Sequence, residues 1–213
     1  HWKNRMQEVF RKEFGVDIGD IDISRVNGKL ERAYFRDFAY SFGISDEVFY
    51  AKFPAASEHF HQLLKGTIEG GHVRYMIIDG VKQIVSRIEK SSHLDMGLVT
   101  GNVEKNAWLK LRSVDFHHPF EVGAYGDAFE DRAALVLHAI TAAAKRFDYP
   151  FVPADTVVVG DTTHDILSAK KIGAFALGVT TGITDTREML EASGADLVVD
   201  TLMDERVLEL LQL

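Results

Sequence analysis

After about residue 75 the sequence alternates short apolar runs with segments of helical periodicity, and this alternation constrains the fold more than any other feature. The apolar runs lie at 96–100, 120–125, 156–159, 175–179 and 197–199, and helical segments at 104–111, 132–147, 165–172 and 186–192 lie between them. Strands that alternate with helices predict a parallel sheet covered by helices on both faces. The run 156–159 is β-branched without polar alternation, which predicts a strand buried on both faces.

The residues before 75 have a different pattern. Apolar side chains recur at helical spacing over 2–14, 30–42 and 46–64, with Pro54 predicting a break in the last segment. Most of these apolar residues are aromatic, and we expect them to pack in a core. The sequence therefore predicts a helical domain at residues 1–75 and an α/β domain at residues 76–213.

Composition excludes several classes of protein. The chain has 24 Lys and Arg against 32 Asp and Glu, a net charge of −8, and this acidity argues against binding to nucleic acid or to an anionic membrane. It has no Cys, which excludes disulfides and thiolate chemistry. The nearly apolar run 133–144 is too short to span a bilayer, and no secretory signal pattern opens the chain. We expect a cytoplasmic protein.

The segment Val157–Asp165 carries the most specific chemical signal. Asp161 follows the end of a predicted buried strand, Gly160 permits a sharp turn there, and Asp165 falls in the first turn of the next helix. Two carboxylates at one end of a sheet repel each other unless a cation lies between them, and Mg²⁺ prefers such oxygen ligands. The alternative is that Asp165 only caps the helix and Asp161 is a turn residue.

Two further segments end near the same predicted sheet edge. Thr100 ends a strand, and its hydroxyl with the backbone N–H groups of Gly101 and Asn102 could hold an anion. Arg132 begins a long helix and could neutralise a phosphate or hold a carboxylate. The alternatives are an ordinary strand–turn–helix junction for the first segment and a solvated surface ion pair for Arg132.

In this order and spacing the three segments resemble the haloacid dehalogenase superfamily. Thr100 matches its second motif, Arg132 its third, and Gly160–Asp165 its fourth, which is the most specific. The resemblance implies a Rossmann-like parallel core with helices on both faces and a helical C1-type cap. It also implies an Mg²⁺-dependent phosphatase, phosphoglycolate-phosphatase-like, that forms an aspartyl-phosphate. Asp161 and Asp165 would hold Mg²⁺, and Thr100, Gly101, Asn102 and Arg132 would hold the phosphate.

The sequence departs from the family at its first motif. The family's nucleophile lies in an Asp-x-Asp-x-Thr segment after the first core strand, and no such segment is present. Asp20-Ile-Asp22-Ile-Ser24 imitates it, but lies within the predicted helical domain and follows no apolar strand. Since the chain begins with His1, we expect the first strand and its catalytic turn upstream, in roughly 15–20 further residues.

The substrate is expected to be a small phosphorylated metabolite. Arg25, Asn27 and Lys29, in the loop before the second helix, could meet an anionic substrate, or could simply be solvated charges. Phosphomutase, phosphonatase and dehalogenase chemistry are alternatives within the family. A non-catalytic interaction protein is the alternative from another class, and is preferred if the nucleophile strand is truly absent. The protein is expected to be a monomer or a homodimer.

Overall fold

The computed structural model describes residues 1–20, 22, 26, 28–116 and 120–213. The chain divides into two compact units. The first contains residues 1–76, 100–117 and 125–130, and the second contains 77–99, 118–124 and 131–213. The first unit thus includes two later segments besides the helical region predicted to end at residue 75. The domain boundary itself stays a prediction.

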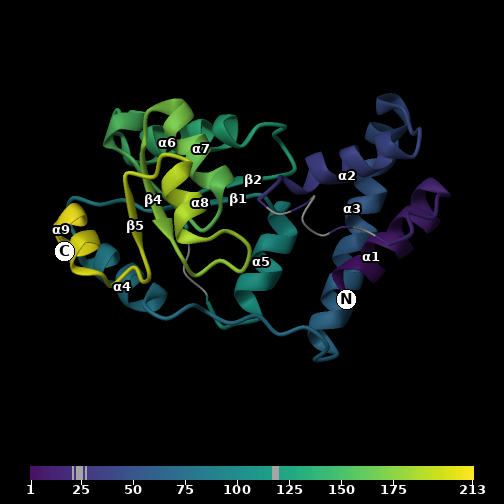
Figure 1. Ribbon diagram of the computed structural model, residues 1–213, viewed down its shortest axis with the longest axis horizontal. Coiled ribbons are helices and arrows are strands. Elements are labelled where there is room, and N and C mark those ends of the chain that lie inside the picture. Colours follow the sequence, from purple (N-terminus) through teal and green to yellow (C-terminus); the bar gives the residue numbers. More distant parts are fainter. Residues whose placement is uncertain (21, 23–25, 27, 117–119) are drawn as a thin grey trace. The chain divides into compact units, whose positions relative to one another are not determined.

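The first unit is helical, as its aromatic periodicity indicates (Figure 1). Its elements are α1 (Trp2–Val9), the π-helical turn η1 (Phe10–Phe14), α2 (Glu31–Ser41), α3 (Asp46–Glu69) and α5 (Glu104–Arg112). The core contains the buried side chains of Met6, Val9, Phe10, Phe35, Phe38, Phe49, Phe53 and Phe60. Phe35 lies at its centre, with its ring 5.7 Å from that of Phe10, 5.8 Å from Phe53 and 5.6 Å from Phe60.

The break predicted at Pro54 is wrong, because α3 continues through it from Asp46 to Glu69. A proline inside a helix removes one backbone hydrogen bond and costs about 3 kcal/mol. Pro54 lies on the exposed side of α3, while Phe53, Ala56 and Phe60 are buried on the other side. Their burial offsets the local cost and keeps the helix continuous.

The second unit contains a three-stranded parallel sheet in the order β3 (Val157–Gly160), β4 (Phe175–Val179) and β5 (Leu197–Val199). Helix α7 (Thr163–Ile172) packs against β3 and β4, α8 (Arg187–Ala192) packs against β4 and β5, and α6 (Arg132–Phe147) packs against α7. The short helix η3 (Pro153–Asp155) precedes β3. Two further helices, α4 (Val81–Lys90) and α9 (Glu205–Leu211), were not predicted from the sequence.

A second, two-stranded sheet joins β1 (Gly97–Thr100) to β2 (Val122–Tyr125). The unit boundary crosses both strands, so that their last residues, Thr100 and Tyr125, belong to the first unit. The predicted strands and the observed ones agree within two residues at each end.

Strand β3 forms one edge of its sheet within the described residues, since it pairs only with β4. The prediction that residues 156–159 are buried on both faces is therefore wrong here. Val157 and Val158 are only partly buried, and Val159 is 46% exposed. A strand beside β3 from residues upstream of His1 stays a prediction. Among the described helices, none is both long and apolar enough to cross a membrane.

Candidate active site

The end of β3 brings the two predicted carboxylates to one corner of the second unit. Asp161 directly follows Gly160, the last residue of β3, and Asp165 lies in the first turn of α7. An ideal Cβ placed on Gly160 would collide with the Cβ and the carboxyl carbon of Asp165. Only glycine allows the strand to end this close to the helix, so Gly160 is required by packing as well as by the turn.

We expect Gly160→Ala to displace the Asp165 side chain and to lower the free energy of unfolding by about 1–3 kcal/mol, as overpacking typically does. Urea denaturation monitored by circular dichroism measures the change. Gly66→Ala is the matched control, because nothing lies within 4 Å of an added Cβ at this position in the last turn of α3. That change should be neutral or stabilise by up to about 1 kcal/mol. Equal stability of Gly160→Ala and wild type would contradict the packing argument.

Asp165 is held on both of its oxygens. Its Oδ1 accepts from Arg132, with Nε at 2.8 Å and Nη2 at 2.6 Å. Its Oδ2 accepts from the backbone N–H of Thr162 at 3.1 Å and from the Thr162 hydroxyl at 2.7 Å. Asp165 is 7% exposed and completes a capping box at the start of α7. Its charge is thus neutralised by Arg132 and its orientation is fixed.

Asp161 has a less favourable electrostatic environment. Burial raises the pKa of Asp161 above its ordinary value, and the negative charge of Asp165 raises it further. Arg132 acts in the opposite direction, while Asp185 adds a third negative charge nearby. Residue 182 beside Asp161 is also a glycine for steric reasons, because a Cβ there would lie 3.0 Å from Oδ2 of Asp161. A cation at this carboxylate would therefore relieve an existing electrostatic cost.

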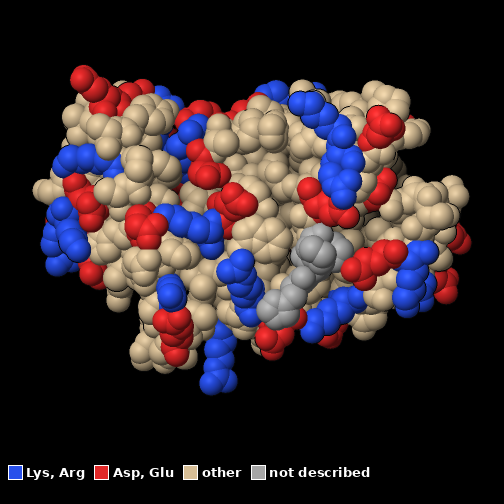
Figure 2. All heavy atoms as spheres, turned by 180° about the vertical axis from the view of Figure 1, so that it is seen from behind, with Lys and Arg blue, Asp and Glu red and all other residues tan. Residues whose placement is uncertain are grey.

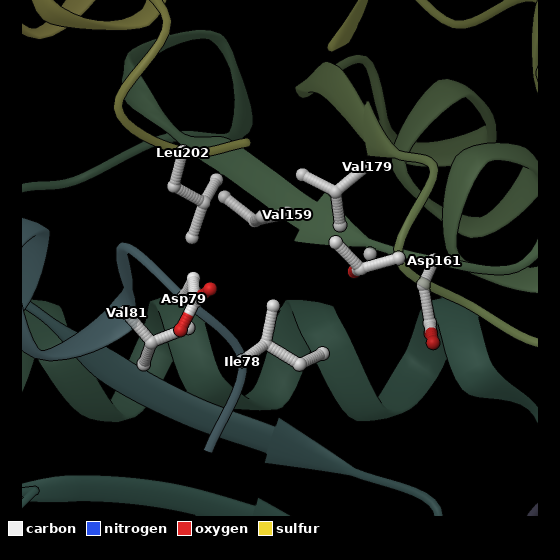
Figure 3. A pocket seen from close by; sticks show the side chains of 9 residues that line it. Ile78, Asp79, Val81, Val159, Asp161, Val179 and Leu202 are labelled. Atoms are coloured by element: carbon white, nitrogen blue, oxygen red, sulfur yellow. The ribbon is translucent and has the colours of Figure 1, made fainter. Parts of the chain in front are cut away.

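A cavity of about 280 Å³ opens beside Asp161 in the second unit (Figure 3). Its walls are mainly aliphatic, with side chains from Ile78, Val81, Val159, Val179 and Leu202. Asp79 and Asp161 lie on opposite sides of it in this view. The cavity thus combines an apolar lining with two acidic side chains. Asp161 comes from the carboxyl end of β3, and Asp79 comes from the segment before α4.

The loop after β1 is organised around the Thr100 hydroxyl. The backbone N–H of Asn102 donates to Thr100 Oγ1 at 3.2 Å, and Asn102 Nδ2 donates to the same oxygen at 2.8 Å. A hydroxyl has two acceptor lone pairs and one donor hydrogen. Since Asn102 supplies a donor to each lone pair, the hydroxyl can offer its own hydrogen to an anion. The Asn102 N–H, predicted to bind phosphate, is directed to Thr100 instead.

The predicted site residues form two groups. Arg132, Asp161 and Asp165 lie in the second unit, and Thr100, Gly101 and Asn102 lie in the first. In the first unit, Lys29 forms an exposed ion pair with Asp37 at 2.6 Å. The candidate specificity residues Arg25 and Asn27 lie outside the described residues.

Sequence reasoning missed three acidic residues. Asp79 precedes Gly80, whose φ of 88° marks a turn before α4. Asp185 is 9% exposed and accepts from the N–H of Thr163 at 2.6 Å, and the polar run after β4 was a usable signal for it. Glu31 is 2% exposed, and no sequence pattern distinguished it from a surface helix residue.

Charges of both signs are interspersed on the face shown in Figure 2, with no basic patch dominating it. Within the described part of the chain, no group of three or more Asp, Glu, His or Cys side chains has the arrangement of a metal site.

Comparison with known proteins connects these features to a family. Residues 134–204 match the family model described as "HAD-hyrolase-like", and this region contains both Asp161 and Asp165. The resemblance to the haloacid dehalogenase superfamily is confirmed. Arg132, which matches the third motif of the superfamily, lies two residues before the region that the family model matches.

A curated protein of similar sequence is "Probable phosphatase IndB" of Dickeya dadantii (strain 3937). It is 49% identical over 51 residues, which cover 24% of this chain and 22% of that protein. The aligned part thus spans about a fifth of the length of this relative.

Solved structures with the haloacid dehalogenase fold match nearly the whole chain. A HAD hydrolase of family IA, variant 3, from Entamoeba histolytica is 16% identical, with a TM-score of 0.69 over 100% of this chain and 92% of that one. A predicted phosphatase from Clostridium acetobutylicum is 18% identical, with a TM-score of 0.64 over 99% and 90%. These similarities confirm the predicted α/β core with a helical cap.

Proposed function

We propose that this chain acts as an Mg²⁺-dependent phosphatase of small phosphorylated metabolites. The observation that carries the proposal is the corner at the end of β3, where Arg132 fixes Asp165 and leaves Asp161 beside like charges. The similarity to a protein named as a probable phosphatase supports it, as does the fold shared with hydrolases.

The donor set at this corner fits a hard divalent cation. Asp161 offers oxygen ligands and has a raised pKa, and the chain contains no Cys whose thiolate could favour a softer metal. Mg²⁺ would be held mainly by Asp161, with Asp165 in a supporting role because its oxygens are already engaged. When bound, Mg²⁺ supplies positive charge against a dianionic ester.

The chain's own residues have distinct roles in this proposal. Arg132 donates two hydrogen bonds to Oδ1 of Asp165 and so fixes the orientation of that side chain beside Asp161. Thr100 donates its hydroxyl hydrogen to a phosphate oxygen, while Asn102 fixes the direction of that hydroxyl. An aspartyl-phosphate would need a nucleophilic Asp of the Asp-x-Asp-x-Thr type, which the printed sequence does not contain. Phosphoglycolate is one candidate substrate.

The absence of an Asp-x-Asp-x-Thr segment from the sequence favours a second candidate, a non-catalytic binding protein. A panel of phosphate monoesters, including phosphoglycolate and p-nitrophenyl phosphate, separates the two. The full-length gene product should be assayed on each ester with excess Mg²⁺ or with EDTA. We expect turnover only with Mg²⁺. Binding of phosphate esters without any turnover would support the second candidate.

A further inference from the structure

Glu31 connects helix α2 to the loop that follows β1. It is the first residue of α2, and its backbone N–H donates to the carbonyl oxygen of Gly101 at 2.6 Å. Its Oε2 accepts from the N–H of Val103 at 3.3 Å, and its Oε1 accepts from Nδ2 of Asn106 at 2.8 Å. One residue therefore holds the loop on both sides of Asn102.

The loop that Glu31 holds is the one that orients the Thr100 hydroxyl. Asn102 donates to Thr100 through its backbone and its side chain, and Lys110 donates to Oδ1 of Asn102. The carbonyl oxygen of Asn102 accepts from Gly126 at 2.8 Å. An ideal Cβ on Gly126 would collide with the carbonyl group of Gly101, so the loop has little room to move.

The carboxylate of Glu31 is in a costly environment when ionised. Burial raises the pKa of Glu31 to about 7, although Lys110 and Lys105 of α5 and the hydrogen bonds from Val103 and Asn106 lower it. The other titratable groups that face it are Arg5 of α1, Tyr34 of α2 and Tyr75, while His61 of α3 contacts Asn106 through Nδ1 at 2.8 Å.

We propose that Glu31 is a positioning residue that sets the Gly101–Val103 loop, and through it the Thr100 hydroxyl and Asn102, for binding the phosphate group of the substrate. This proposal rests on the proposed function. An ionised carboxylate accepts from Val103 and Asn106 at the same time, whereas a protonated one must use one oxygen as a donor. Protonation therefore weakens one of the two contacts and loosens the loop.

The first test follows the loop without any substrate. The backbone amides of Gly101, Asn102 and Val103 are observed by NMR between pH 5.5 and 9. We expect them to titrate with a midpoint near 7 in the wild type, and not in Glu31→Gln. Glu47→Gln, an exposed change in the first turn of α3, is the matched control and should titrate like the wild type. If the midpoint persists in Glu31→Gln, the proposal is overturned.

The second test measures the dissociation constant of inorganic phosphate in the wild type and in Glu31→Gln, with the chemical shifts of these amides as the readout. Taking the ratio of the two constants at each pH cancels the ionisation of phosphate itself. At pH 8.5 we expect Glu31→Gln to bind about tenfold more weakly, the effect of losing one hydrogen bond. At pH 5.5 the two proteins should bind equally. Equal binding at both values overturns the positioning role.

The two tests keep this inference separate from the proposed function. A protein that turns over no phosphate ester, but whose loop amides titrate through Glu31 and bind phosphate as described, refutes the phosphatase and supports the role of Glu31 in anion binding. A protein that turns over esters with amides that do not respond to Glu31→Gln supports the phosphatase and refutes the positioning role.

Discussion

Replacing Asp161 by Asn is expected to lower Mg²⁺-dependent phosphatase turnover by at least about 100-fold. A metal ion contributes several kcal/mol of charge stabilisation in phosphoryl transfer, and each 1.4 kcal/mol corresponds to about tenfold in rate. The carboxylate of Asp161 is the acidic group at this corner whose pKa is raised by burial and by Asp165. The measurement is kcat/KM on an active ester, with Mg²⁺ affinity followed by calorimetry.

The same substitution should leave the protein at least as stable as the wild type. A carboxyl group with a raised pKa in the folded state binds more protons than in the unfolded state, so its contribution to stability falls as pH rises above about 4. The Asp161→Asn variant has no carboxyl group at this position, so its stability lacks this pH dependence.

Asp148→Asn is the matched control for both activity and stability. Asp148 is an exposed cap of α6 with φ of 50°, which Asn adopts as readily as Asp. Unchanged turnover in Asp161→Asn would refute the metal role.

Phe35→Ala should lower the free energy of unfolding of the first unit by about 3–5 kcal/mol, the usual loss for a large aromatic side chain in a core. Phe35 is fully buried and packs against the rings of Phe10, Phe53 and Phe60. Removing it leaves a cavity among these three aromatic residues. Urea denaturation followed by tryptophan fluorescence measures the loss, since the two tryptophans, Trp2 and Trp108, both lie in the first unit.

Phe42→Ala is the matched control for this prediction. Phe42 lies at the end of α2 and is 42% exposed, so we expect its removal to cost less than about 1 kcal/mol. Similar losses for the two variants would show that the aromatic cluster does not form the stabilising core of the helical unit.

Periodicity predicted the elements well because each one follows from local physics. The long helix 132–147 and the strand 197–199 agree with the predicted residues at both ends, and Asp131 caps the helix with its side chain. The fourth motif was recognisable because Gly160, Asp161 and Asp165 are close in sequence, so that their arrangement depends on one strand–helix connection.

Features that depend on distant residues could not be predicted in this way. The continuity of α3 through Pro54 depends on tertiary packing of its opposite side. The pairing of Arg132 with Asp165 joins residues 33 positions apart. The burial of Glu31 depends on Val103 and Asn106, which are 72 and 75 residues away. None of these contacts leaves a periodic signal in the sequence.

The outer edge of β3 determines where this sheet can be extended. Within the described residues, that edge presents backbone donors and acceptors without a neighbouring strand, next to the exposed side chain of Val159. Such an edge is a template for another extended backbone, and proteins usually protect it with charge, a bulge or a covering segment. Among the described residues, the outer edge of β3 is therefore the place where a further extended segment could pair with this sheet, directly before the Asp161 corner.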